Sequence, residues 1–248
     1  MKKQLFFQSA VVSTILSYLL IFVGGLVRVS GSGMGCPDWP RCFGRWIPPT
    51  SVDQIPSYID PTAFNIVLAW IEYSNRSLGV LVGLSIIVLN IIAIYYFRKE
   101  TKLLISAILS LILVVANGGL GAIVVSSILN PFLVSLHMIL ALMLVSVLSY
   151  ACIESYKLIH EDKFKNLQGS RALSNSLILF WLLIFIEILL GTGIRTNLEL
   201  ISIDNPLLSK GELLNALDSY KYFHSFLGFT LLFLSIYIYA KLKNHNLF

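Results

Sequence analysis

Long apolar stretches alternate with short polar segments along this chain. Six of the stretches are long enough to cross a bilayer, which takes about 20 apolar residues in a helix. They lie at residues 9–28, 64–97, 103–127, 131–153, 174–195 and 217–240. Because lipid cannot satisfy an exposed backbone, each stretch must be helical. The pattern predicts an all-α fold, a polytopic membrane helical bundle with six transmembrane helices.

Composition and charge agree with this prediction. The 248 residues are 56% hydrophobic and 12% charged, with a mean hydropathy of +0.81, whereas soluble domains are about 25% charged. The net charge of +5 arises from Lys and Arg at both termini and near 98–102 and 157–171. Positive residues mark cytoplasmic segments, so we expect both termini inside and segment 29–62 outside. The charge is therefore no argument for a nucleic-acid partner.

The outer segment is rich in Gly, Pro and aromatic residues, which is typical of a loop. It contains Cys36 and Cys42, and its expected position in an oxidising compartment favours a disulfide between them. The alternative is that Cys36 and Cys42 are two unrelated thiols that form no disulfide. Cys152 lies near the cytoplasmic end of the fourth stretch, where we expect a small buried residue.

Polar residues interrupt the second apolar stretch. Glu72, Asn75 and Arg76 stand at positions i, i+3 and i+4 and share one helical face. Ionisable groups within a bilayer are costly, so they are functional candidates. Two interpretations remain open at this point. In the first, Glu72 and Arg76 form an ion pair in which the two charges neutralise each other. In the second, Glu72 accepts a proton beside an oxidisable ligand.

Two histidines lie within apolar stretches, His137 in the fourth and His224 in the sixth. Each is a candidate axial ligand for haem iron or a hydrogen-bonding helix contact. Two further candidates are Arg28 and Arg195, at the expected outer ends of their spans. Their guanidinium groups could pair with carboxylates such as haem propionates. The alternative is that they extend to the lipid headgroups. Glu187 lies too far from Arg195 for direct pairing, and no role follows for it from the sequence.

The segments GGLVR (24–28) and GTGIR (191–195) indicate an internal repeat in which spans 1 and 2 correspond to spans 5 and 6. A counterpart of His137 is then expected near position 286, beyond the end of this sequence. We expect a four-helix repeat over 1–157, a cytoplasmic linker over 158–172 and an incomplete second repeat over 173–248. Glycines within the spans permit close helix approach or contact with a flat ligand.

Five blocks carry a resemblance to a known family. They are GGLVRVSGSGMGCPDWPRCFG (24–44), WIEYSNRSLGVLVG (70–83), NGGLGAIVVSSILNPFLVSLHMILAL (117–142), LLGTGIRTNLE (189–199) and KYFHSFLGF (221–229). With them the chain resembles haem A synthase, a family of cytochrome oxidase assembly. The resemblance implies eight spans in two four-helix repeats, each offering two histidines to a haem. One half would hold substrate haem O, whose ring methyl becomes a formyl group, and the other a haem b that carries electrons.

The resemblance also assigns roles. It makes His137 an iron ligand of the substrate half and His224 one of the cofactor half. Glu72 matches the acid of the family's Glu-x-x-His-Arg motif, which takes part in methyl oxidation. Cys36 and Cys42 match an outer-loop pair that forms a disulfide connected to electron flow or haem transfer.

The chain departs from the family pattern at several places. Asn75 stands where the motif usually has histidine, so the substrate half offers a single imidazole. Ser225 replaces the arginine that usually follows the second-half histidine. The last two spans, with their histidine, have no counterpart among these 248 residues.

Three functions are compatible with these residues. The first is a haem A synthase of the bacterial cytoplasmic (inner) membrane, working beside a haem O synthase and oxidase assembly factors, with homo-oligomerisation left open. The second is a degenerate or split haem-binding membrane protein without catalysis. The third is a thiol oxidoreductase built on Cys36 and Cys42, which would be expected to carry a second cysteine pair, whereas only Cys152 remains.

Overall fold

We describe the fold from a computed structural model, which defines residues 1–164, 171–205, 207–217 and 219–244. The chain divides into two compact units, Met1–Lys165 and Asn166–Phe248, and each is treated by itself. Within the defined ranges the structure is helical and contains no strand, apart from an isolated bridge between Cys42 and Arg45. The all-α prediction is confirmed.

Six helices of the defined ranges are long and apolar enough to cross a membrane. They are α1 (Lys2–Ser30), α2 (Ile66–Tyr96), α3 (Thr101–Ser126), α4 (Pro131–Ile159), α6 (Arg171–Asp204) and α8 (Tyr220–Asn244). Two short α-helices are also present, α5 (Glu161–Phe164) and α7 (Lys210–Ala216). The α1–α2 connection contains three 3₁₀ helices, η1 (Ser32–Met34), η2 (Val52–Gln54) and η3 (Pro61–Ala63). The chain is a multi-pass membrane protein, as predicted.

Several predicted boundaries are wrong. α1 begins at Lys2 rather than at residue 9, and α4 ends at Ile159 rather than at residue 153. The fifth span was expected to end at residue 195 and to be followed by a loop, but α6 continues to Asp204. Residues 196–204 contain neither glycine nor proline, so no residue there forces the helix to stop. The predicted linker over 158–172 contains the end of α4 and the single turn of α5, and its residues 165–170 lie outside the defined ranges.

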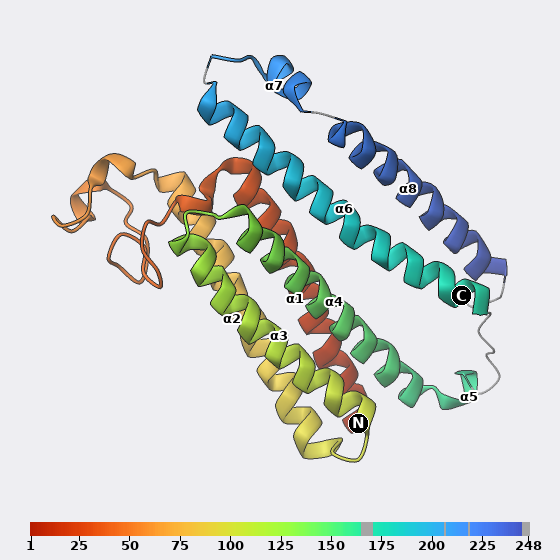
Figure 1. Cartoon of the computed structure of the whole chain (residues 1–248). Helices are drawn as coiled ribbons and strands as arrows, with labels where there is room; N and C mark the ends of the chain where they lie inside the picture. Colours follow the sequence, from red (N-terminus) through yellow and green to blue (C-terminus); the bar gives the residue numbers. More distant parts are fainter. Residues whose placement is uncertain (165–170, 206, 218, 245–248) are drawn as a thin grey trace. The chain divides into compact units, whose positions relative to one another are not determined.

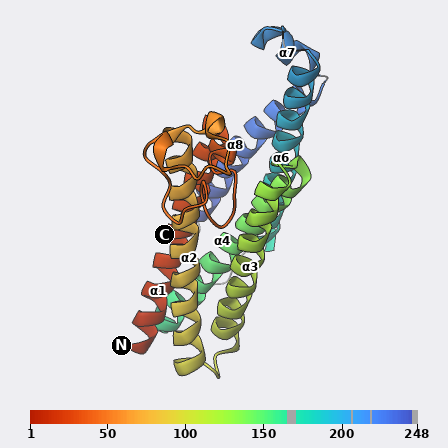
Figure 2. The same ribbon diagram turned by 90° about the vertical axis from the view of Figure 1, so that its left-hand side faces the viewer.

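Unit 1 is an antiparallel four-helix bundle in which α1 packs on α2 and α4, and α3 packs on the same two helices (Figure 1). The connection between α1 and α2 gathers at one end of this bundle (Figure 2). At that end Asn65 caps α2 by accepting hydrogen bonds from the N–H groups of Val67 and Leu68. Asn130 caps α4 in the same way, with Pro131 in the first turn. Both caps fix helix starts beside the candidate site.

The apolar core of unit 1 fills the opposite half of the bundle. Its fully buried members include Phe6, Ile86, Leu89 and Leu148. On the loop side, buried side chains are sparse. Among the defined residues, α1 has none after Ser17, and α2 has none between Glu72 and Val82. The helices therefore hold each other mainly through the half that is remote from the loop.

Unit 2 consists of α6 and α8 packed side by side, with α7 contacting α6 in the connection between them. A capping box starts α7, since the Ser209 hydroxyl accepts from the Glu212 N–H and the Glu212 carboxylate accepts from the Ser209 N–H. The α6–α8 pair carries His224.

Candidate functional site

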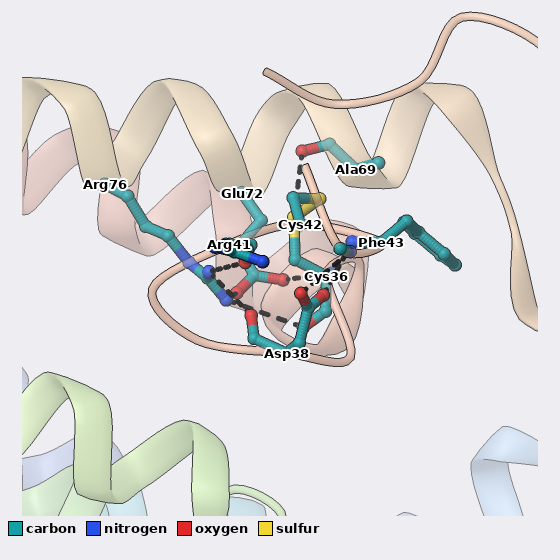
Figure 3. Close-up of a disulfide and its surroundings, with 9 residues drawn as sticks. Cys36, Asp38, Arg41, Cys42, Phe43, Ala69, Glu72 and Arg76 are labelled. Carbon is teal, nitrogen blue, oxygen red and sulfur yellow. Dashed lines mark hydrogen bonds and ion pairs between the residues drawn. A yellow bond between two sulfur atoms is a disulfide. The ribbon is translucent and has the colours of Figure 1, made fainter. Parts of the chain in front are cut away.

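The expected disulfide between Cys36 and Cys42 is present, and both cysteines are fully buried (Figure 3). The remaining cysteine, Cys152, is half-buried in α4, where its sulfur lies 3.4 Å from the Thr14 hydroxyl. The core packing places this thiol in the half of unit 1 that is remote from the loop.

The disulfide loop lies directly on the backbone of α2. A Cβ atom on Gly35 would come within 2.4 Å of the Leu68 carbonyl oxygen and 2.9 Å of the Ala69 nitrogen. The sulfur of Cys36 is 3.7 Å from the Ala69 carbonyl oxygen. A disulfide sulfur carries no proton, so this is a packing contact. Only glycine at position 35 permits so close an approach.

Glu72 is the acid that meets this loop. Its side chain is 4% exposed, and its Oε2 accepts a 2.7 Å hydrogen bond from the backbone N–H of Cys36. Its Oε1 forms an ion pair with the Arg76 guanidinium one turn along α2. The Glu72–Arg76 pair, one of the two interpretations that the i, i+4 spacing left open, therefore forms. The loop backbone adds a contact that the sequence pattern did not indicate.

Arg76 also holds the loop itself. Its Nη1 donates hydrogen bonds of 3.0 Å to the carbonyl oxygens of both Asp38 and Arg41. The Asp38 carboxylate in turn accepts from the N–H groups of Phe43 at 2.6 Å and Gly44 at 2.9 Å. Figure 3 shows this network around the disulfide. Sequence reasoning missed Asp38, although an aspartate in a Pro-rich turn commonly accepts nearby backbone N–H groups.

His137 of α4 lies in the sparsely packed half of unit 1. A Cβ atom on Gly121 of α3 would be 3.3 Å from its Cε1 atom. Its Nδ1 is buried without a hydrogen-bond partner, as are the side-chain oxygens of Asn75 and Asn117. Gly24 of α1 faces the Asn75 oxygen at 3.7 Å from its ideal Cβ position. Buried polar atoms without partners are costly, so these groups suit a bound ligand.

These features fit a haem group. The loop-side half of unit 1 has few buried side chains, presents glycine to His137 and Asn75, and leaves an imidazole nitrogen without a protein partner. A flat porphyrin needs such glycine-lined space, and its iron takes imidazole. Asn75 is an amide and not an imidazole, so His137 is the one imidazole that the defined residues of this half would offer to the iron.

In unit 2, His224 of α8 meets Glu187 of α6. Nδ1 of His224 lies 2.9 Å from Oε1 of Glu187, an ion-pair distance that does not meet the angular geometry of a hydrogen bond. Sequence reasoning found no role for Glu187, and the structure gives it this partner. Glu187 and Gly191 are one turn apart on α6, as are His224 and Gly228 on α8. This matching spacing of a polar residue and a glycine on each helix was the sequence signal that could have indicated the contact between Glu187 and His224.

The two arginines are placed differently. Arg28 lies in the last turn of α1, as expected, and is half-buried. Arg195 is also half-buried, but it lies within α6 because that helix continues to Asp204. Both arginines interact with other groups of the protein.

The profile of the cytochrome oxidase assembly protein family matches residues 8–246. The haem A synthase of Geobacillus thermodenitrificans is 30% identical over 136 residues, which cover 55% of this chain and 38% of that protein. The haem A synthase of Listeria monocytogenes serotype 4a is 28% identical over 140 residues, covering 56% and 41%. That of Geobacillus kaustophilus is 26% identical over 137 residues, covering 55% and 38%.

The matched segments thus span about two fifths of the length of these curated relatives. No solved structure matches the chain significantly. The family profile, by contrast, covers nearly the whole sequence, from the first helix to the end of α8. This chain belongs to the cytochrome oxidase assembly protein family.

Proposed function

We propose that this chain is a haem A synthase, which oxidises a ring methyl of haem O to the formyl group of haem A for cytochrome c oxidase. The observation that carries the proposal is the position of Glu72. A buried acid is held between Arg76 and a disulfide loop, at the end of unit 1 where α4 begins and carries His137. The names of the relatives support the same reaction.

In this proposal the residues of unit 1 bind and orient the substrate. His137 holds the iron of haem O, and the glycine faces at Gly24 and Gly121 admit its ring. The bound iron porphyrin supplies the redox chemistry. Oxidation of the methyl to the formyl group would take its oxygen atom from water and release electrons and protons, and Glu72 is the proposed acceptor of a released proton. Each carboxylate oxygen has two lone pairs, so the bonds to Cys36 and Arg76 leave acceptor capacity on both oxygens.

His224 of unit 2 is proposed as an iron ligand of haem b, which carries electrons away from the reaction. Arg28 and Arg195 are proposed partners of haem propionates, because a guanidinium binds carboxylates in a bidentate fashion. The disulfide between Cys36 and Cys42 is proposed to take part in electron flow or in haem transfer. The network around Glu72 supports a link between this disulfide and the acid.

The proposed location is the bacterial cytoplasmic membrane, with both termini inside and the cysteine loop outside. It rests on the six apolar helices and on the distribution of basic residues. The proposed partners are a haem O synthase that supplies the substrate and assembly factors that receive the product.

The test is coexpression of the chain with a haem O supplier, followed by chromatography of the extracted haems. Haem A is expected with the natural sequence and absent with Glu72→Gln. Glu154→Gln is the matched control, since Glu154 also forms ion pairs, with Lys102 and Lys157 in the remote half of unit 1. No haem A from a folded, haem-loaded chain would contradict the proposal.

A second candidate is a haem-binding protein without turnover, either degenerate or one part of a split pair. Asn75 favours it, because an amide replaces the second imidazole expected in unit 1. One bound haem, unchanged after incubation with electron acceptors and oxygen, would support this candidate over the enzyme.

A further inference from the structure

We propose that Glu187 is a positioning residue for His224, which sets the orientation of this imidazole toward a haem iron. The inference rests on the proposed function, in which His224 is the iron ligand of the second half. It assigns a role to an acid that neither the sequence pattern nor the family resemblance explains.

The first support is the distance. Oε1 of Glu187 lies 2.9 Å from Nδ1 of His224, and both side chains are partly shielded, with 19% and 36% of their surfaces exposed. An acid within a membrane span needs a partner, and His224 is the partner that the defined part of unit 2 provides for Oε1. The other oxygen, Oε2, is buried without a hydrogen bond. Among the defined residues, His224 is thus the side chain that Glu187 pairs with.

The second support is the way the two helices interlock. A Cβ atom on Gly191 would be 3.2 Å from Cε1 of His224, and one on Gly228 would be 3.2 Å from Oε1 of Glu187. Each helix therefore presents a glycine to the polar side chain of the other. A Cβ atom at either glycine would require the facing side chain to shift. The close approach of each polar side chain to the opposite helix therefore depends on glycine at these two positions.

The chemistry that follows is a carboxylate acting on a metal-binding imidazole. A carboxylate oxygen 2.9 Å from Nδ1 favours the tautomer that carries its proton on Nδ1, which leaves Nε2 for the metal. The carboxylate also makes the imidazole a stronger electron donor, and such contacts tune the reduction potential of haem iron. A more basic ligand stabilises the ferric form, which lowers the potential.

His137 has no carboxylate partner among the defined residues. Nδ1 of both imidazoles lacks a hydrogen bond of good geometry, but His224 has Glu187 at ion-pair distance, whereas His137 faces the backbone of Asn117 on α3. The two imidazoles are therefore held differently in the two units. We expect the haem bound through His224 to be retained more firmly than the haem bound through His137, as suits a cofactor in one half and an exchanging substrate in the other.

The experiment uses the full chain in lipid nanodiscs with His137→Ala, so that the remaining haem reports on unit 2. Ferric protohaem is titrated, and its affinity, electron paramagnetic resonance signal and midpoint potential are measured. Glu187→Ala is expected to weaken haem binding 10- to 100-fold, the usual effect of losing such a partner. Glu187→Gln, which keeps the shape but loses the charge, is expected to raise the midpoint potential. Glu212→Gln, an exposed acid of α7, is the matched control and should change neither quantity.

A second pair of variants moves the carboxylate without deleting it. Gly228→Ala is expected to displace Glu187 and to shift the potential in the same direction as Glu187→Gln. Gly193→Ala is its control, because a Cβ atom there meets nothing within 4 Å. An unchanged affinity and potential in both Glu187 variants, with haem lost in His224→Ala, would overturn the inference alone. Haem retained in His224→Ala would overturn the ligand assignment and the inference with it.

Discussion

The backbone N–H of Cys36 donates a 2.7 Å hydrogen bond to Oε2 of Glu72. The first cysteine of the disulfide and the buried acid of α2 are thereby joined directly. Arg76 completes the connection, because it pairs with the other carboxylate oxygen and donates to the loop carbonyl oxygens of Cys36, Asp38 and Arg41. A change in the disulfide loop must therefore change the hydrogen bonding of Glu72, and a change at Glu72 must loosen the loop.

This coupling predicts a structural effect of Glu72→Gln besides the loss of haem A formation. The amide leaves the Arg76 guanidinium without its counter-charge in a mostly buried site, and breaking one partner of a buried pair costs on the order of 3–5 kcal/mol. The loop should detach more often, and its disulfide should be reduced faster. The rate of alkylation of Cys36 and Cys42 under mild reductant measures this.

Glu154→Gln is again the control and should leave the alkylation rate unchanged. Equal disulfide reduction rates in the Glu72 variant and the natural sequence would show that the loop is held by other contacts.

A second prediction concerns the contact between Gly35 and α2. Gly35→Ala places a Cβ atom 2.4 Å from the Leu68 carbonyl oxygen, and that backbone atom cannot move aside without disturbing the first turn of α2. Overpacking of this kind costs about 1–3 kcal/mol. Faster disulfide reduction and lower thermal stability of the loop are expected, measured by alkylation and limited proteolysis.

Gly33→Ala is the matched control in the same loop. Its Cβ atom would meet only the end of the Leu129 side chain, at 3.2 Å, which can rotate away. If both variants behaved alike, steric contact with the α2 backbone would not be the reason for glycine at position 35.

A third prediction tests the proposed haem site of unit 1. Gly121→Ala would press on the His137 ring, whose Cε1 would lie 3.3 Å from the new Cβ atom, and would occupy space that the porphyrin needs. Haem content at this site should fall, as read from the Soret absorbance per protein with His224→Ala present. Gly119→Ala faces open space and should retain the haem. A normal Soret band in the Gly121 variant would place the porphyrin elsewhere.

The sequence was informative wherever one helix or the bilayer decides the structure. Span length is fixed by the membrane, so the six helices were predicted, with ends displaced by up to nine residues (195 predicted against Asp204 in α6). The i, i+4 spacing offered the Glu72–Arg76 pair as one of two interpretations. The bond between Cys36 and Glu72 was not foreseeable, since it joins a loop backbone to a helix whose register becomes known only in the folded bundle. The pairing of Glu187 with His224 was missed for the same reason, because the two residues lie on different helices.

The last prediction concerns the start of α7 and its dependence on pH. Hydrogen bonds from the Ser209 hydroxyl and N–H hold the pKa of the Glu212 carboxyl below its ordinary value of 4.5. A lowered pKa means that the folded helix start favours the charged carboxylate, so its contribution to stability is complete above 4.5 and is lost as the pH falls through the lower folded value. Hydrogen-exchange protection of the first turn of α7 should therefore be constant near neutral pH and decrease in acid. Ser209→Ala should reduce the protection at neutral pH and remove most of its pH dependence. A protection factor that stays constant into strong acid in the natural sequence would mean that the capping box does not hold this helix start.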